Sequence, residues 1–310
     1  MTDVIVVGGG PAGLTAGLYL ARAGRSVLVL EESTPGGQIN FSPLVENYPG
    51  LPRVAGSELG DTLAQQAQDL GAQLEYESVT AVTPLEDGFQ VDTDCGSHTC
   101  KGLILATGVR HRPLGLPGEE ELVGQGISYC AVCDGPFCKG KPVAVVGGGD
   151  TALQDALFLA QLCPQVTLIH RRDQFRGAQR LVDQVKACPN IQCLMDSTVE
   201  ALDQADGQLT GIQVKNKVTG ETTALAVDNL FVAVGQQPQN ERFADLVKLD
   251  EAGYIRSSDC RTSRPGVYAA GDCRTKSVRQ LTTAVSDGTV AALLFLGQYR
   301  TEKSARYRQV

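Results

Sequence analysis

Residues 4–13 read VIVVGGGPAG, an apolar run followed by the pattern G-x-G-x-x-G. The run predicts a buried strand, and residues 14–23 predict a helix directly after the glycines. A second strand is expected over residues 26–30, and Glu31 follows it. This order is typical of a dinucleotide-binding unit, in which the glycines let a pyrophosphate approach the backbone and the acid binds a ribose hydroxyl.

The same pattern returns later in the chain. Residues 142–152 contain an apolar run followed by GGGDTA, and a helix is expected next. Each copy continues into short alternating segments, at residues 79–105 and 199–215, and closes on an apolar strand that ends at Gly108 or Gly235. The sequence therefore predicts an internal repeat of two Rossmann-like, three-layer α/β domains, each with a β-meander.

The two copies differ at the position of the acid. Glu31 lies 23 residues after the first glycine of copy one (31 − 8). At the same distance in copy two (170 − 147) stands His170, and Arg171, Arg172 and Arg176 follow. An acid suits a free 2′-hydroxyl, whereas arginines bind a 2′-phosphate through bidentate, charge-assisted hydrogen bonds. Copy one is expected to hold an adenine dinucleotide without that phosphate and copy two to hold NADPH. The alternative is a solvated basic helix start without a ligand.

After the second copy, the chain is expected to return to the first domain. An apolar strand leads to Gly271 and Asp272, and an acid at the carboxyl end of a sheet strand lies where open α/β sheets bind ligands. We therefore place the first domain at residues 1–113 and 242–310, with the NADPH domain, residues 114–241, inserted in it. The long irregular segment 33–53 is either a ligand-wrapping segment or an ordinary surface loop.

Residues 130–135, between the two copies, read CAVCDG. The two thiols of such a motif can close a small disulfide, and their pKa values are lowered enough to exchange it. Asp134 can move a proton to or from a thiolate. Cys130, Cys133 and Asp134 are therefore the catalytic candidates. Because the second fingerprint follows closely, we expect the dithiol to lie on the NADPH domain.

Composition limits the class of protein. The chain has 310 residues, enough for two domains, with 42% hydrophobic and 20% charged residues. A net charge of −8 argues against general binding to nucleic acid or membrane surfaces. The first residues enter a strand at once and the apolar run 290–296 is far too short to span a bilayer, so we expect a cytoplasmic protein without a secretory signal. Ten cysteines in such a protein are not a disulfide framework.

These motifs, in this order over essentially the whole chain, resemble the low-molecular-weight, bacterial-type thioredoxin reductases of the pyridine nucleotide-disulfide oxidoreductase class II. The resemblance also rests on residues 36–38 (GGQ), 46–50 (ENYPG) and 266–272 (GVYAAGD), followed by Arg279 and Gln280. It implies a homodimeric flavoenzyme that passes two electrons from NADPH to FAD, then to the Cys130–Cys133 disulfide, then to thioredoxin.

The resemblance also implies individual roles. Cys133 would lie nearer the flavin, Cys130 would attack the thioredoxin disulfide, and Asp134 would protonate leaving groups. Because nicotinamide and dithiol share one domain and FAD lies mainly in the other, we expect one domain to rotate against the other about hinges near Pro113 and Gln239. Residues 236–240 (QQPQN) are a looser version of the family's Gly-x-x-Pro-Asn turn.

Two sets of cofactor-binding residues follow, and no metal ligand is among them. The residues expected to bind FAD are Gly8, Gly10, Pro11, Ala12, Gly13, Glu31, Gly37, Gln38, Asn47, Val82, Thr107, Gly108, Gly271, Asp272, Arg279, Gln280 and Leu281. The residues expected to bind NADPH are Gly147, Gly149, Asp150, Thr151, His170, Arg171, Arg172 and Arg176.

Three alternatives remain open. Cys130, Cys133 and Cys138 could belong to a zinc site, although no fourth ligand is apparent. Related flavin–disulfide proteins oxidise small dithiols with oxygen or take electrons from ferredoxin, but these would not need the basic cluster. A nucleotide-sensing module could use the CxxC as a redox switch rather than for catalysis.

Overall fold

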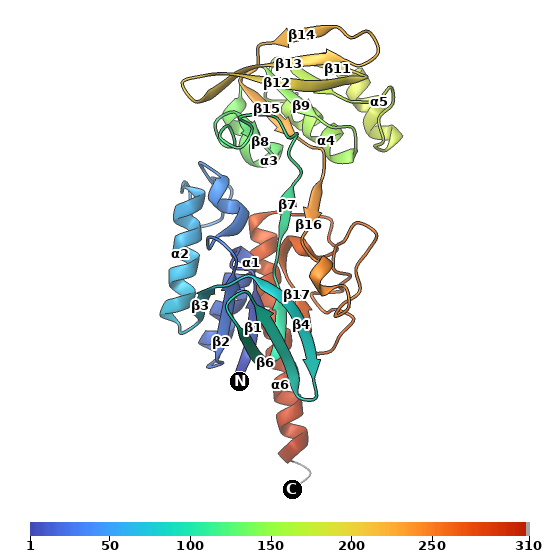
Figure 1. Ribbon diagram of the computed structural model, residues 1–310. Helices are drawn as coiled ribbons and strands as arrows, with labels where there is room; N and C mark the ends of the chain where they lie inside the picture. The colour runs from blue at the N-terminus through green and yellow to red at the C-terminus, as the bar shows by residue number, and fades with distance from the viewer. Residues whose placement is uncertain (308–310) are drawn as a thin grey trace. The chain divides into compact units, whose positions relative to one another are not determined.

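The structure, a computed structural model, describes residues 1–307, with side chains described through residue 298. The chain divides into two compact units. Unit 1 comprises Met1–Arg110 and the part of the chain from Gln237 onward, and unit 2 comprises His111–Gln236. The predicted domain boundaries lie a few residues further along the chain. In Figure 1 the colours of the two ends, blue and red, both occur in unit 1, as expected for an inserted domain.

Unit 1 contains one mixed sheet and three long helices. Its strands are β1 (Thr2–Val7), β2 (Val27–Glu31), β3 (Gln73–Tyr76), β4 (Val79–Leu85), β5 (Gly88–Thr93), β6 (Ser97–Leu105) and β17 (Val267–Ala269). Its helices are α1 (Pro11–Arg22), α2 (Gly56–Asp69) and α6 (Leu281–Tyr307), with 3₁₀ turns η1 (Gly37–Phe41), η3 (Glu241–Phe243) and η4 (Gly271–Cys273). The sheet order is β3-β2-β1-β6-β5-β4, with β17 beside β6. The antiparallel meander β4–β6 is thus continuous with the parallel strands.

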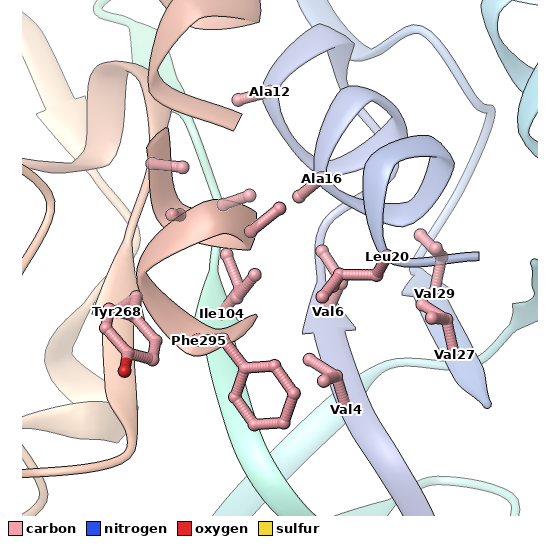
Figure 2. Packing of buried hydrophobic residues seen from close by; sticks show 14 of the residues in the cluster. Val4, Val6, Ala12, Ala16, Leu20, Val27, Val29, Ile104, Tyr268 and Phe295 are labelled. Atoms are coloured by element: carbon pink, nitrogen blue, oxygen red, sulfur yellow. The ribbon is translucent and has the colours of Figure 1, made fainter. Parts of the chain in front are cut away.

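In the parallel part of the unit 1 sheet, β1 and β2 are buried on both faces, which explains their continuous apolar sequence, whereas the edge strand β3 is mostly exposed. Along β1, Val4 and Val6 pack in a cluster with residues of α1 and α6 (Figure 2). The alternate residues Ile5 and Val7 pack on the opposite side with residues of the meander and η3. A strand covered on both faces holds its carboxyl end, and the glycine turn after it, in one position.

Unit 2 repeats this plan with a separate meander. Its strands are β8 (Ile127–Ser128), β9 (Val143–Val146), β10 (Val166–Ile169), β11 (Ile191–Leu194), β12 (Ser197–Ala205), β13 (Gln208–Asn216), β14 (Thr222–Leu225) and β15 (Asn229–Val232). Its helices are α3 (Ala131–Asp134), α4 (Asp150–Leu159) and α5 (Gln179–Ala187), with the 3₁₀ turn η2 (Gly135–Cys138). A parallel sheet has the order β11-β10-β9-β15-β8, and β12-β13-β14 form an antiparallel sheet of their own.

The predicted repeat of two Rossmann-like domains is confirmed by sheet order. The order β3-β2-β1-β6-β17 in unit 1 corresponds strand for strand to β11-β10-β9-β15-β8 in unit 2. Several short elements were not predicted, namely β3, β7 (Val109–His111), β8, β11, β14, β16 (Gln236–Pro238), α3 and α5. The strands have only two to four residues and no clear alternating pattern, and α5 was missed although Leu181, Val182 and Val185 recur at helical spacing. Helix α6 contains the apolar run 290–296 noted in the sequence. The two crossings between units pair as a short ribbon of β7 and β16.

Candidate active site

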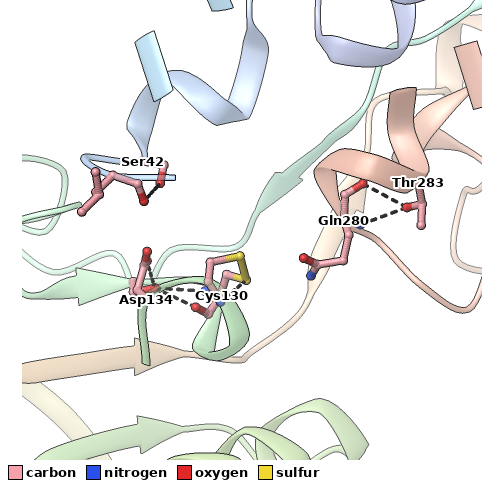
Figure 3. The surroundings of a disulfide bond; sticks show 8 residues. Ser42, Cys130, Asp134, Gln280 and Thr283 are labelled. Atoms are coloured by element: carbon pink, nitrogen blue, oxygen red, sulfur yellow. Dashed lines mark hydrogen bonds between the residues drawn. A yellow bond between two sulfur atoms is a disulfide. The ribbon is translucent and has the colours of Figure 1, made fainter. Parts of the chain in front are cut away.

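A disulfide joins Cys130 and Cys133, with their Cα atoms 5.3 Å apart (Figure 3). Strand β8 leads into it, and the single-turn helix α3 begins directly after Cys130. The backbone N–H of Cys133 donates to Cys130 Sγ at 3.2 Å. Both cysteines are only partly buried. A disulfide in a short turn, reachable by solvent and facing a backbone donor, is arranged for thiol–disulfide exchange.

Asp134 completes this cluster. Its Oδ2 lies 2.5 Å from Ser128 Oγ, which also accepts a hydrogen bond from Cys130 N–H at 3.1 Å. Its Oδ1 is buried, with no hydrogen-bond partner among the described residues. Burial raises the pKa of Asp134, and the Ser128 hydrogen bond opposes the shift. The carboxyl therefore retains a proton to higher pH than an exposed aspartate does, as a proton donor to a thiolate must.

The other cysteines near the disulfide are arranged as unreactive thiols. Cys138 and Cys163 are buried, and burial raises the pKa of Cys138 to about 12. Such thiols carry almost no thiolate at neutral pH. No group of three or more potential metal-binding side chains occurs in the part of the chain that the structure describes.

The first glycine fingerprint forms a tight turn between β1 and α1. Gly8 has φ = +105°, and a Cβ there would lie 2.4 Å from the carbonyl oxygen of Ala106. Helix α1 begins after Gly10 with no side-chain cap, and Pro11 occupies its first turn. The N–H groups of that turn are therefore available to an anion, as a dinucleotide pyrophosphate requires. Ala12 and Gly13 are buried on α1 beneath this turn.

Glu31 lies at the end of β2, beside the same turn. It is 7% exposed, and its Oε2 accepts a hydrogen bond from Gly9 N–H at 2.6 Å. Its Oε1 accepts from Ser33 N–H at 2.9 Å. Oε1 also accepts from the Ser33 hydroxyl at 3.2 Å, whereas Oε2 can accept a second hydrogen bond, so a ribose hydroxyl can still bind here.

Asp272 lies in η4, directly after β17. Its Oδ1 is buried without a hydrogen-bond partner in the described structure, and burial raises its pKa. The turn is held by Gly271 N–H, which donates to Asp287 Oδ2 at 3.0 Å. The Nζ of Lys276 lies 3.9 Å from Asp272 Oδ1, beyond hydrogen-bond distance, and a buried carboxyl oxygen without a hydrogen-bond donor costs free energy unless a ligand supplies one. Asp272 thus fits a site for a hydroxyl-bearing ligand such as FAD.

The remaining residues predicted for FAD divide into several groups. Gln38, in η1, and Asn47 are exposed, whereas Gly37, Thr107, Gly108 and Val82 of β4 are half-buried. Arg279 donates to the carbonyls of Asp272, Arg274 and Lys276, so it shapes the η4 loop. Gln280 N–H donates to Thr283 Oγ1 immediately before Leu281, the first residue of α6 (Figure 3).

The second fingerprint, in unit 2, forms the same kind of turn between β9 and α4. A Cβ at Gly147 would lie 2.4 Å from the carbonyl oxygen of Ala233. Helix α4 begins after Gly149 without a side-chain cap. Asp150 and Thr151 are both exposed at this end of the helix. Asp150 Oδ1 accepts from Ala178 N–H at 2.7 Å, which ties the fingerprint to the loop after β10.

That loop carries the basic cluster. His170 is buried, its Nε2 is 3.0 Å from the carbonyl oxygen of Gln174, and burial lowers its pKa. Arg171, Arg172 and Arg176 are exposed, and Arg176 N–H donates to the carbonyl of Gly148 at 2.7 Å. The alternative of a basic helix start does not describe this segment, which is irregular, since α5 begins only at Gln179. The three exposed arginines are accessible to a phosphate.

Several residues important to these sites were not predicted. Ser128 and Asp287 carry no motif, and their roles depend on hydrogen bonds that form only in the fold. Asn240, in the loose turn at 236–240, is fully buried and donates to the carbonyls of Gly253 and Cys273. Thr107 Oγ1 also bonds to it at 2.9 Å. The terminal Asn of that turn was the available signal.

Comparison with known proteins gives consistent matches. The family model described as pyridine nucleotide-disulphide oxidoreductase matches residues 2–288. A thioredoxin reductase of Treponema pallidum (strain Nichols) is 42% identical over 292 residues, covering 94% of each chain. One of Bacillus subtilis (strain 168) is 39% identical over 293 residues, 94% of this chain and 92% of the relative. The crystal structure of thioredoxin reductase from Streptococcus pyogenes MGAS5005 matches with a TM-score of 0.93 and 38% identity, covering 97% of this chain and 99% of that one.

The search for membrane-crossing segments was negative: none of the described helices combines the length and apolar character needed to traverse a bilayer. The family match includes both glycine fingerprints, the CxxC disulfide and Asp272. The chain therefore belongs to the pyridine nucleotide-disulphide oxidoreductase family, as an oxidoreductase related to the thioredoxin reductases.

Proposed function

We propose that this protein uses NADPH to reduce the disulfide of thioredoxin or a thioredoxin-like protein. The observation that carries the proposal is the Cys130–Cys133 disulfide, with Asp134 beside it, on the unit that also carries the arginine cluster. In the first half-reaction NADPH, a proton and the disulfide give NADP⁺ and two thiols. In the second, the two thiols and the partner's disulfide give the Cys130–Cys133 disulfide and two partner thiols.

The residues present fit both cofactors. Unit 1 would hold FAD through the turn at Gly8, the carboxylate of Glu31 and the buried oxygen of Asp272 that lacks a hydrogen-bond donor. FAD, when bound, supplies the two-electron chemistry that links a nicotinamide to a disulfide. Unit 2 would hold NADPH at the uncapped start of α4, with Arg171, Arg172 and Arg176 on its 2′-phosphate.

Three side chains take part in the dithiol chemistry. Cys130 attacks the partner's disulfide as a thiolate, and the Cys133 N–H near its sulfur stabilises that charge. Cys133 then attacks Cys130 in the mixed disulfide and releases the reduced partner. Asp134 gives a proton to the leaving thiolate and recovers it when Cys133 is deprotonated, so no net proton is lost from the carboxyl.

Three further features belong to the same proposal. One unit rotates against the other, so that the nicotinamide and the dithiol reach the flavin in turn. The protein acts in the cytoplasm, where eight unpaired cysteines stay reduced. It assembles as a homodimer, as the resemblance to the bacterial-type thioredoxin reductases implies.

The first test is an anaerobic titration of the FAD-loaded protein with NADPH, followed through the yellow flavin absorption. FAD and one disulfide each accept two electrons, so about two equivalents of NADPH are expected to be consumed. The Cys133→Ser variant has no disulfide and is expected to consume about one. The titrated protein is then mixed with oxidised thioredoxin, whose new thiols are counted.

If the flavin remains oxidised with NADPH but is reduced by ferredoxin or a small dithiol, that reductant, and not NADPH, would be the electron donor. Full reduction by NADPH without transfer to thioredoxin would instead indicate another acceptor or a redox-sensing role. If Cys130, Cys133 and Cys138 belonged to a zinc site, the purified protein would contain stoichiometric zinc and no flavin.

A further inference from the structure

The hydroxyl of Ser128 lies between the Asp134 carboxyl and the backbone of Cys130. Ser128 Oγ is 2.5 Å from Asp134 Oδ2 and accepts from Cys130 N–H at 3.1 Å. The carbonyl oxygen of Cys130 is 3.4 Å from the same hydroxyl. One side chain thus contacts both the proton donor and the cysteine that meets the partner.

A hydroxyl has one proton to donate and can accept two hydrogen bonds. Cys130 N–H uses one acceptor position permanently. When Asp134 is ionised, the hydroxyl proton points at Oδ2. When Asp134 is protonated, its own O–H donates to Ser128 Oγ, and the hydroxyl proton turns to the Cys130 carbonyl. Both protonation states of Asp134 are therefore satisfied without movement of the backbone.

No other described hydrogen bond holds this carboxyl, because Asp134 Oδ1 is buried without a partner. Ser128 itself is 5% exposed, at the end of β8, and its register partner is Phe231 in the parallel strand β15. The hydroxyl is therefore anchored to a rigid sheet. An Asp134 that lost this contact would be free to turn within its short helix.

We propose that Ser128 is a positioning residue for proton transfer: it holds Asp134 in place beside the backbone of Cys130 in both the charged and the neutral form of the carboxyl. The inference rests on the proposed function, since it gives Asp134 a proton donor's role in thiol–disulfide exchange. It extends that function to a residue that contacts neither the reacting sulfur atoms nor a cofactor.

Other titratable groups near α3 must be distinguished from Asp134. Cys138 lies on η2, and Asp150 and Asp155 lie on α4; both elements pack against α3. Burial raises the pKa of Cys138 to about 12 and that of Asp155 to about 7. In the reduced protein the Cys130 and Cys133 thiols titrate as well. Asp155 is the group most easily mistaken for Asp134, so an Asp155→Asn variant is the matched control.

The experiment compares Ser128→Ala, Ser128→Thr, Asp134→Asn and the Ser128→Ala/Asp134→Asn double variant with the parent, in the FAD-loaded protein. Two rates are measured over about pH 5 to 9, the range in which a raised carboxyl titrates. The first is kcat/KM for thioredoxin with NADPH. The second is the rate at which dithiothreitol reduces the Cys130–Cys133 disulfide, where the variant-to-parent ratio cancels the reagent's own titration. Circular dichroism melting checks that each variant is folded.

Ser128→Ala is expected to lower both rates about 10- to 100-fold, the value of one hydrogen bond to a charged group. The fall in rate at alkaline pH should move to higher pH, because the hydroxyl no longer stabilises the carboxylate. Ser128→Thr should restore rate and profile. Asp134→Asn should abolish the alkaline fall, and adding Ser128→Ala should then change nothing further, since the two residues act as one unit.

Parent-like rates and profile in Ser128→Ala would overturn the inference. A further full loss on adding Ser128→Ala to Asp134→Asn would also overturn it, because it would indicate a structural role. So would an alkaline fall that Asp155→Asn, rather than Asp134→Asn, removes. If the parent protein does not reduce thioredoxin, the proposed function fails, while the dithiothreitol rates still decide the role of Ser128.

Discussion

At the scale of single residues, the proposed preference for NADPH depends on three side chains in the loop after β10. Arg171, Arg172 and Arg176 are exposed there, and no ion pair among the described side chains engages them. Arg176 is also anchored through its backbone to Gly148 of the fingerprint. Their charges can therefore reach a 2′-phosphate without first breaking an internal contact.

Replacement of each of these arginines by alanine is expected to raise KM for NADPH about 10- to 100-fold, because one charge-assisted hydrogen bond to phosphate is lost. KM for NADH should change little, since NADH has no 2′-phosphate. Steady-state kinetics with both nucleotides measures the ratio. Arg180→Ala, an exposed arginine on α5, is the control. Equal losses for NADPH and NADH would contradict the assignment.

At the scale of elements, the turn between β1 and α1 admits no side chain at Gly8. Its φ of +105° is unfavourable for other residues, and a Cβ would collide with the Ala106 carbonyl. Gly24, after α1, also has a positive φ of +70° but open space around it. Alanine variants at the two positions therefore distinguish the loss of stability caused by backbone strain alone from the additional loss caused by a steric collision.

Gly24→Ala is expected to lower the free energy of unfolding by about 1 kcal/mol, from strain alone. Gly8→Ala is expected to cost more, about 3 kcal/mol, and to release FAD, because the turn must move away from β6. Urea unfolding and the flavin content after gel filtration measure the two effects. A Gly8→Ala protein with full flavin content would show that this turn does not bind the cofactor.

A second element, the crossing that enters unit 2, depends on Glu119. This carboxylate is 2% exposed and accepts from the N–H groups of Leu114, Gly115 and Leu116. It also accepts from the hydroxyl of Tyr129, the residue before Cys130. One buried acid thus holds the crossing and the start of the redox segment together.

Glu119→Ala is expected to lower the free energy of unfolding by about 3 kcal/mol, because it removes a buried carboxylate that accepts four hydrogen bonds. Glu121→Ala, at an exposed position two residues away, should change it by less than about 0.5 kcal/mol. Denaturant unfolding followed by circular dichroism compares them. Equal stability of the two variants would mean that solvent replaces the Glu119 contacts.

At the scale of the whole molecule, the two structural repeats have the same sheet but differ in their chain continuity and in the groups that they carry. Both fold as the same five parallel strands, yet the first is split in sequence and the second carries the disulfide. Only two crossings, β7 and β16, connect them. Two bodies joined in this way are suited to a rotation that presents the dithiol first to the flavin and then to a partner protein.

Covalent cross-linking of the two units is expected to abolish turnover with thioredoxin while FAD remains bound. A bifunctional amine reagent is applied, the species linked between units are identified by mass spectrometry, and turnover is measured on them. Protein treated with the monofunctional form of the reagent is the control. Full turnover by the cross-linked protein would contradict the rotation.

The sequence alone determined the repeat, the order of the domains, the redox motif and the basic cluster. These features are local: a glycine turn such as Gly8–Gly13, a buried strand and a CxxC each depend on neighbouring residues. Short elements such as β3 and β8 were missed, since strands of two to four residues owe their structure to the sheet that they join.

Only the tertiary structure showed what supports the site. Ser128 lies six residues before Asp134, Glu119 holds a crossing, and Asp287 fixes the turn that carries Asp272. The structure also showed that His170 is buried against its own loop, with its Nε2 3.0 Å from the carbonyl oxygen of Gln174. Such contacts join side chains from separate elements, and their partners are chosen by the direction of each side chain in the folded core, which no local pattern records.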